Sequence, residues 1–237
     1  MNEKRENYEW YLIKSNSAGG HDTRSHRDDF ISWGNPGVNE FRVVGRLAYP
    51  IFAYMIAEGF RYTRYRWRYF SIIWVIGLVC SVIDYIARGS LYQSIFITFA
   101  ISILYMLGSS YVKDQYKHMT RYQHVLWALI CIVVLGLTAY ICYGKPIPGF
   151  IIDYGFWGIV TPVIIYLANT KTAKFIALTV GLRILSFELG PNQIYALWAL
   201  PLLALYNGER GPGFKLFFYV YYPLHLGVLY MIKQIYW

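Results

Sequence analysis

Charged residues are scarce in this sequence, and some long stretches contain none. Only 15% of its 237 residues are charged, whereas 57% are apolar and 19% are aromatic. A soluble domain carries more charge than this, so the composition favours a membrane protein over a water-soluble enzyme or binding domain. The eight Trp and 24 Tyr residues agree, because amphipathic rings gather where a membrane meets water.

Cysteine is also rare, and its placement argues against a metal centre. The three cysteines, Cys80, Cys131 and Cys142, show no spacing typical of metal ligands and lie within apolar segments. We therefore expect them to be small core residues, and we expect no metal site.

Long apolar runs predict the fold. A helix needs about 20 apolar residues to cross the hydrocarbon layer of a membrane, and eight segments are candidates, although the sixth and seventh are short and Pro201 interrupts the seventh. We predict an all-α protein, a polytopic transmembrane helix bundle of about eight spans within residues 43–237. The predicted spans are Val43–Phe60, Tyr69–Ala87, Leu91–Tyr111, Val125–Tyr143, Phe150–Ala168, Phe175–Leu189, Gln193–Tyr206 and Leu216–Ile232.

The net charge of +9 comes from basic residues in the short loops between these runs. Cytoplasmic loops are enriched in Lys and Arg, and the loops of this chain alternate between basic and nearly neutral. We therefore assign the basic charge to membrane topology and expect no nucleic-acid partner. The basic loops hold Arg61, Arg64, Arg66, Arg68, Lys113, Lys117, Arg121, Lys171, Lys174, Arg210 and Lys215, and the opposite loops hold only Arg88, Lys145 and Lys233.

The first 42 residues do not fit this topology. They are polar and basic, and they contain neither an apolar segment nor a signal-peptide pattern. Because the loop after the first predicted span is cytoplasmic, this segment would have to lie outside, and a basic tail without a signal is a poor candidate for translocation. One span is therefore missing before Val43, and we treat residues 1–42 as a separate segment, either disordered or translated out of frame.

Two motifs bracket the predicted helical domain. Val44–Arg64, VGRLAYPIFAYMIAEGFRYTR, resembles a signature of the TraX family, in which a Gly-Arg-x-x-x-Pro-x-Phe run precedes Gly-Phe and Thr-Arg. Asn207–Leu226, NGERGPGFKLFFYVYYPLHL, is similar to the other signature of that family, which closes on Tyr-Pro-x-His-Leu. The middle of the chain matches mainly in hydropathy.

The resemblance implies a function that composition does not. TraX-like proteins are associated with conjugative transfer and amino-terminal acetylation of pilin. The resemblance therefore implies a multi-pass protein of the bacterial cytoplasmic (inner) membrane. It also implies that this protein transfers acetyl from acetyl-coenzyme A to an amino group of a pilin-like peptide or another envelope substrate. Two alternatives remain open: a non-catalytic membrane protein of pilus assembly or transport, and an inactive gene remnant.

The resemblance also offers an explanation for the missing span. The family's first helix normally carries an Asp-His-Ile-Gly motif, which would bring an intact member to nine spans, and residues 1–42 lack that motif. With suitable synonymous codons, Asn7–Gly34 read one base later gives an apolar span containing it. Our hypothesis is that this segment is an out-of-frame translation. A gene whose codons cannot give the apolar peptide in the neighbouring frame would rule it out.

Arg46 and His225 are the candidate catalytic residues. His225 lies two residues after Pro223, which opens or kinks the last predicted helix, and a neutral imidazole there can act as general base toward an amine. The alternative is a hydrogen-bonded packing histidine. Arg46 lies about a turn inside the first predicted span, where it belongs either to a polar site or to a side chain that snorkels to the outer interface.

The basic cytoplasmic loops supply candidate donor-binding residues. Acetyl-coenzyme A carries several phosphates and approaches from the cytosol, so Arg and Lys on that side could form a phosphate-binding lip; the alternative is that they only set topology. We expect Glu58 to pair with Arg61 or Arg64. The candidate donor-binding residues are Arg61, Arg64, Arg210 and Lys215, the candidate substrate-binding residues are Tyr222 and Asn207, and Asp84, Asp153, Arg183 and Glu188 are expected to pair within the bundle.

The loop charges predict the outcome of a topology experiment. A reporter fused after Lys215 should be cytoplasmic, and one fused after Lys145 should lie outside, because the basic loops remain in the cytosol. Paired activity and fluorescence reporters at both positions measure this directly. The reverse pattern would overturn the assignment.

Overall fold

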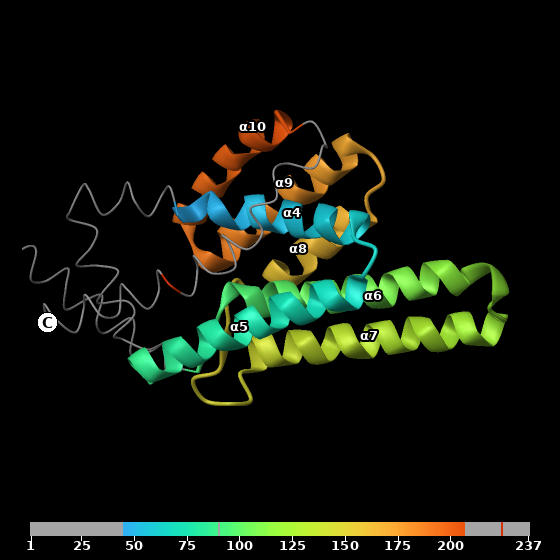
Figure 1. The fold of residues 1–237 in the computed structure, drawn as a ribbon, viewed down its shortest axis with the longest axis horizontal. Coiled ribbons are helices and arrows are strands. Elements are labelled where there is room, and N and C mark those ends of the chain that lie inside the picture. Colours follow the sequence, from blue (N-terminus) through green and yellow to red (C-terminus); the bar gives the residue numbers. More distant parts are fainter. Residues whose placement is uncertain (1–44, 90, 207–223, 225–237) are drawn as a thin grey trace, which may run out of the picture. The chain divides into compact units, whose positions relative to one another are not determined.

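The computed structural model describes residues 45–89, 91–206 and 224. The chain divides into two compact units, Met1–Gly45 and Arg46–Trp237, and the helices α4–α10 and both strands belong to the second. Its described part is built almost entirely from helices (Figure 1). The α-helices are α4 (Ala48–Tyr62), α5 (Arg66–Arg88), α6 (Ile95–Gln115), α7 (Arg121–Gly144), α8 (Gly155–Leu167), α9 (Lys171–Leu189) and α10 (Ala199–Ala204); the 3₁₀ helices are η1 (Tyr116–His118) and η2 (Pro191–Trp198).

Three helical segments are long and apolar enough to cross a membrane, judged by length and composition among the described residues. They are Arg66–Ile86, Ile95–His118 and Arg121–Gly144, and the apolar helix α8 is shorter. These three coincide with the second, third and fourth spans predicted from the sequence. The membrane character and helical class are thereby supported, and the total of eight spans stays a prediction.

Local sequence signals fix several helix ends. Helix α7 begins at a capping box, in which the Thr120 hydroxyl accepts a bond from the Gln123 backbone N–H and the Gln123 side chain accepts one from the Thr120 N–H. Helix α5 is capped at its carboxyl end by Gly89, whose left-handed backbone (φ 64°) suits a residue without a Cβ. These caps satisfy backbone groups that a helix leaves unpaired at its ends.

The seventh predicted span, Gln193–Tyr206, is not a single α-helix. The structure forms the 3₁₀ helix η2 and then the six-residue helix α10, which together extend about 25 Å. Proline at positions 191 and 201 removes backbone donors at the start of η2 and within α10, which disfavours a continuous α-helix. The eighth predicted span lies outside the described residues except for Leu224.

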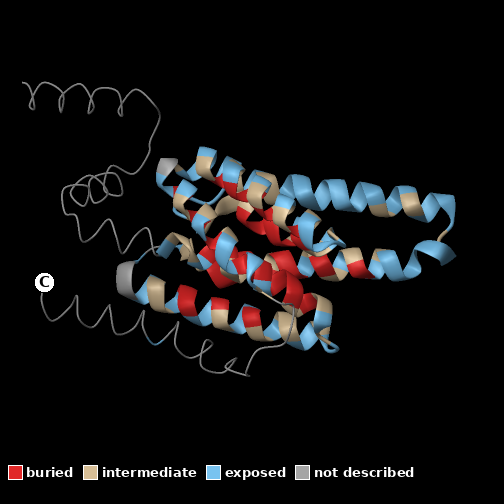
Figure 2. Ribbon diagram, turned by 90° about the horizontal axis from the view of Figure 1, so that it is seen from above, coloured by how far each residue is buried: buried red, intermediate tan, exposed pale blue. Residues whose placement is uncertain are grey.

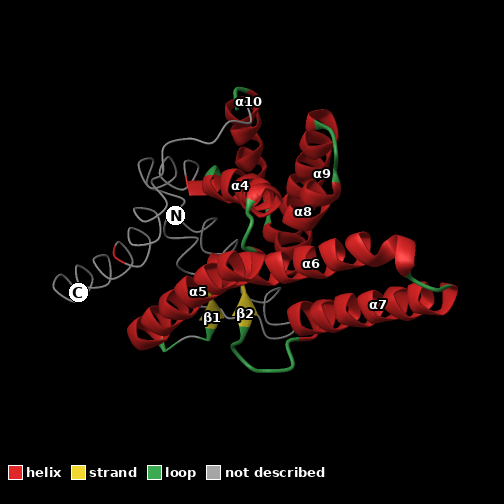
Figure 3. Cartoon of the chain, turned by 45° about the vertical axis from the view of Figure 1, so that its right-hand side comes forward, coloured by secondary structure: helices red, strands yellow, loops and turns green. Residues whose placement is uncertain are grey.

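The sequence did not predict a small parallel sheet between two loops. Strand β1 (Tyr92–Gln93) pairs with β2 (Ile151–Ile152), so the loop before α6 joins the loop after α7. Figure 3 shows the two strands at the end of α6 and α7 that lies opposite their connecting turn. Both loops belong to the nearly neutral set, so the pairing agrees with their assignment to one side of the membrane.

Helices α8 and α9 pack closely through a glycine. A Cβ added at Gly181 would lie 2.4 Å from the Thr161 Oγ1, so only glycine allows the two backbones this approach. The buried core gathers where α4, α6, α8 and α9 meet, whereas no residue of α7 is buried (Figure 2). The apolar exposed surface of α7 suits contact with lipid.

We expect Gly181→Ala to destabilise the protein, because the added methyl group must displace Thr161 or separate the helices. Overpacking of this kind typically costs about 1–3 kcal/mol. Thermal unfolding in detergent measures the change. The matched control is Gly136→Ala in α7, where the added Cβ meets no atom within 4 Å; an equal loss in both variants would contradict the packing argument.

Candidate functional site

Helix α4, which carries the first TraX-like motif, has a polar cluster at each end. Tyr49 and Arg61 are twelve residues apart on this helix, so the two clusters are separated by about 18 Å. The loop charges predict that the Tyr49 end faces outward and the Arg61 end faces the cytosol. The motif therefore contributes to two sites rather than to one.

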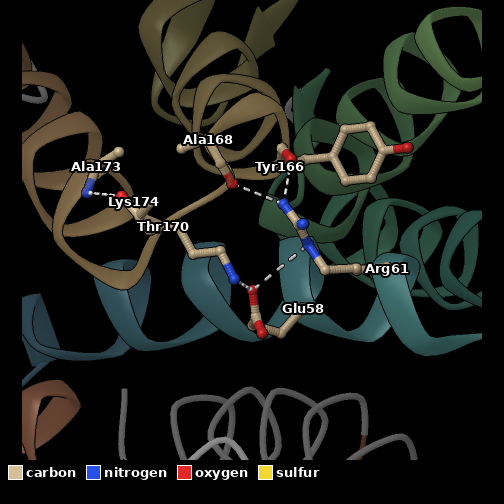
Figure 4. A network of polar contacts seen from close by, with 7 residues as sticks. All are labelled: Glu58, Arg61, Tyr166, Ala168, Thr170, Ala173 and Lys174. Carbon is tan, nitrogen blue, oxygen red and sulfur yellow. Dashed lines mark hydrogen bonds and ion pairs between the residues drawn. The ribbon is translucent and has the colours of Figure 1, made fainter. Parts of the chain in front are cut away.

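At the Arg61 end of α4, a buried ion pair joins α4 to α9 (Figure 4). The Lys174 Nζ donates to the Glu58 Oε1 at 2.5 Å, and both side chains are less than 10% exposed. Arg61 is the more distant partner, with its Nε 4.0 Å from the same oxygen. The expected pairing of Glu58 with Arg61 is thus present, but Lys174 is the closer partner.

Two basic side chains at this end cap the carboxyl ends of neighbouring helices. The Arg61 guanidinium donates to the Tyr166 and Ala168 carbonyl oxygens, at 2.5 and 2.7 Å, where α8 ends. Lys171 likewise donates to the Ala204 and Tyr206 carbonyls at the end of α10, at 3.0 and 2.9 Å. Positive charges at helix carboxyl ends are favourable because they satisfy free carbonyls and oppose the helix dipole.

Beside this network lies a pocket of about 950 Å³, which we call the basic pocket. It is lined by the α4–α5 loop, the first turn of α5, the carboxyl half of α6 and Trp127 of α7. The Tyr111 and Trp127 rings, 5.5 Å apart between centroids, join α6 and α7 there. The polar and aromatic residues that line it are Thr63, Arg64, Tyr65, Arg66, Trp67, Arg68, Ser110, Tyr111, Asp114 and Trp127.

The arginines give the basic pocket its charge. Arg66 pairs with Asp114 at 3.9 Å, in an exposed contact that is weak in water. The Arg64 guanidinium lies over the Tyr65 ring, 5.8 Å from its centroid. Three guanidinium groups and one carboxylate leave a net positive lining, which suits an anionic ligand with an aromatic part.

At the outward end, Arg46 meets the turn that precedes α8. Its guanidinium lies within electrostatic range of Asp153 and within hydrogen-bonding range of the Tyr154 hydroxyl. The Tyr154 ring stacks on Tyr49, with 4.2 Å between centroids, and the Tyr49 hydroxyl donates to the Gly158 carbonyl. Arg46 is partly exposed and lies with Tyr49, Asp153 and Tyr154 in a polar cluster, which we call the outward cluster after the side that the loop charges predict for it.

Hydrogen bonds hold the Asp153 segment in place. The Tyr92 hydroxyl donates to the Asp153 Oδ1 at 2.5 Å, and the Thr98 hydroxyl donates to the Asp153 carbonyl at 2.6 Å. Gln193 of η2 adds a side-chain amide beside the Tyr154 hydroxyl. The sequence marked Asp153 only as a charge in need of a partner, and its contact with Arg46 could not be inferred because 107 residues separate the two in the chain.

The structure places three of the predicted site residues in three different surroundings. Arg46 lies in the outward cluster, Arg61 caps α8, and Arg64 lines the basic pocket; Arg61 is not among the residues that line it. The other predicted site residues lie outside the described residues. They are Asn207, Arg210, Lys215, Tyr222 and His225.

Comparison with known families agrees with the two motifs. The TraX protein family matches residues 20–233. The chain belongs to the TraX family. The match covers both motifs and the helices between them, and TraX membership supports a membrane protein related to pili or conjugation. It begins inside the segment of the out-of-frame hypothesis, which lies outside the described residues. No curated protein and no solved structure matches the chain.

The Glu58–Lys174 pair generates a stability prediction. Lys174→Met should destabilise the protein by about 3–5 kcal/mol, because it leaves a buried carboxylate without its closest partner. The double variant Glu58→Leu/Lys174→Met should recover most of that loss, since no buried charge then remains unpaired.

Thermal unfolding of both variants in detergent measures the effect. Asp114→Asn, which breaks the exposed pair with Arg66, is the control and should cost no more than about 1 kcal/mol. A double variant that is no more stable than Lys174→Met would show that the pair does not act as a unit.

Proposed function

We propose that this TraX protein is a membrane-embedded acetyltransferase that binds acetyl-coenzyme A in the basic pocket and acetylates an amino group of a pilin-like peptide or another envelope substrate. The observation that carries the proposal is the lining of that pocket, which combines three arginines with Trp67, Tyr111 and Trp127. Family membership supports the biological setting, and the acetyl transfer is our inference.

The lining suits the nucleotide part of the donor. Guanidinium groups bind phosphate oxygens through paired hydrogen bonds, and aromatic rings stack on a base. The volume of about 950 Å³ lies at the upper end of the range for small-molecule sites. The pocket also lies beside the loops that the charge pattern assigns to the cytosol, from which the donor would come.

The proposed reaction exchanges one bond for another. The amine nitrogen attacks the thioester carbonyl, a C–N bond forms and the C–S bond breaks. A base takes the amine proton and returns it to the departing sulfur, so that coenzyme A leaves as its thiol. We retain His225 as the proposed base, on the strength of its sequence motif alone. Arg46 is proposed to stabilise or orient polar groups of the acceptor, since it lies next to the Tyr49 end of α4, about 18 Å from the Arg61 end.

Arg61 takes a different part in this scheme. Its guanidinium donates to the α8 carbonyls and approaches Glu58, so these contacts occupy it within the protein. We therefore assign phosphate binding to Arg64, Arg66 and Arg68 first. Arg210 and Lys215 remain proposed members of the phosphate-binding lip.

Substitution of the pocket arginines tests the proposal. Arg64→Gln and Arg68→Gln should each weaken coenzyme A binding about 10-fold, because a charge-assisted hydrogen bond is worth roughly 1.5–3 kcal/mol. Isothermal titration of the purified protein in nanodiscs measures the dissociation constant, and an acetyl-transfer assay with a free-amine peptide measures activity.

The control is Arg121→Gln, a basic residue on the same predicted side that does not line the pocket; it should leave binding unchanged. Equal effects of all three variants on coenzyme A binding would show that the pocket arginines serve membrane topology and not phosphate binding. No coenzyme A binding by the native protein would favour the non-catalytic alternative.

A further inference from the structure

We propose that the basic pocket also binds an anionic phospholipid of the adjacent membrane leaflet, with the phosphate headgroup at the arginines and an acyl chain along α6. This lipid site goes beyond the proposed function. Only its regulatory consequence rests on that function: because the lipid and acetyl-coenzyme A share the arginines, the lipid competes with the donor for the pocket.

The pocket follows α6 over the depth of a single leaflet. The α6 residues that line it begin at Leu104 and end at Asp114, ten residues apart, which is about 15 Å along the helix. Helix α6 belongs to one of the three segments that are long and apolar enough to cross a membrane. The hydrocarbon layer of a bilayer is about 30 Å thick, so one leaflet contributes about 15 Å. The length of the pocket therefore matches one layer of lipid.

The end of the pocket at Asp114 is polar and basic. The Arg66 guanidinium lies 3.9 Å from the Asp114 carboxylate, and Arg64 and Arg68 are exposed. Guanidinium groups bind phosphate oxygens through paired hydrogen bonds. Basic pockets between membrane helices on the cytoplasmic side, which is the side that the loop charges predict here, are typical sites for anionic headgroups. This end of the pocket therefore suits a phospholipid phosphate.

The other end of the pocket is apolar and open. Leu104, Leu107 and Gly108 line it, and Leu104 is 49% exposed. A Cβ added at Gly108 would meet no atom within 4 Å, so space is free beside the helix. Water against apolar side chains is unfavourable, and the phosphates of a soluble nucleotide offer no apolar surface in its place. An acyl chain fills this space favourably.

Aromatic side chains lie between the two ends. The Tyr111 and Trp127 rings join α6 to α7, with 5.5 Å between their centroids, and amphipathic rings of this kind gather where hydrocarbon meets the headgroups. Figure 3 shows α6 and α7 side by side, and no residue of α7 is buried. The wall that α7 contributes is therefore exposed to lipid, and a lipid can enter from the side.

Binding of short-chain lipids to the full chain in a neutral detergent tests the proposal, with native mass spectrometry giving the dissociation constants. Dioctanoyl phosphatidylglycerol should bind about 10-fold more tightly than dioctanoyl phosphatidylcholine, whose choline cation offsets the phosphate charge. It should also bind about 10-fold more tightly than glycerol phosphate, which is an anion without acyl chains.

Each of the opposite results would overturn the lipid site. Equal binding of the two lipids would show that the arginines do not read the headgroup charge. Binding of glycerol phosphate as tight as that of the anionic lipid would show a site for free anions. No binding of phosphatidylglycerol would exclude the site outright.

Variants of two glycines locate the acyl chain. Gly108→Leu fills the open space and keeps the arginines, so it should weaken phosphatidylglycerol binding about 10-fold or more, while the better helix former leaves the unfolding temperature equal or higher. The matched control is Gly136→Leu in α7, where the added Cβ also meets no atom within 4 Å and which does not line the pocket. It should leave lipid binding unchanged. A folded Gly108→Leu protein with native lipid affinity would overturn the proposal.

Competition with the donor tests the regulatory consequence. Phosphatidylglycerol at about ten times its dissociation constant should raise the apparent dissociation constant of coenzyme A about 10-fold, because only one ligand can hold the arginines. The same concentration of phosphatidylcholine should raise it less. Independent binding of lipid and coenzyme A would overturn the competition. A native protein that binds the lipid and no coenzyme A would refute the proposed function and with it the competition, while the lipid site would stand on its own titration.

Discussion

The ion pair between Glu58 and Lys174 is the contact on which the Arg61 end of the described bundle depends. Two charges in an apolar interior are tolerated only together, so α4 and α9 cannot separate there without exposing an unpaired charge. Arg61 and Lys171 extend the network to the ends of α8 and α10. Four helices are thereby held in register by polar contacts, in a setting where apolar contact with lipid and with protein differ little in free energy.

The basic pocket and the outward cluster lie at opposite ends of one helix, α4. The α4–α5 loop contributes Arg64 and the first turn of α5 contributes Arg66 and Arg68 to the basic pocket, whereas the segment just before α4 contributes Arg46 to the outward cluster. In the proposed reaction, an acetyl group delivered at one end would have to travel along the bundle, or the acceptor would have to reach inward to meet it. In either case, the fixed length of α4 sets the distance that the donor and the acceptor together must cover.

Much of the helical layout could be predicted from the sequence, because charge-free runs bounded by basic loops are strong local signals. The predicted Tyr69–Ala87 and Val125–Tyr143 lie within α5 and α7. Lys174 was predicted as a loop anchor because no local pattern reveals that it turns inward to Glu58, 116 positions earlier. The aromatic wall of the basic pocket and the contact of Arg46 with Asp153 were beyond prediction for the same reason, since both arise from packing between distant segments.

The 3₁₀ geometry of η2 has a mechanical consequence. A 3₁₀ helix rises about 2.0 Å per residue and an α-helix about 1.5 Å. If the eight residues of η2 rewound into α-helix, the segment would shorten by about 4 Å and turn about its own axis. Gln193, near the start of η2, would shift and rotate with the segment. The helix type of this short segment therefore determines which groups the Gln193 amide can reach.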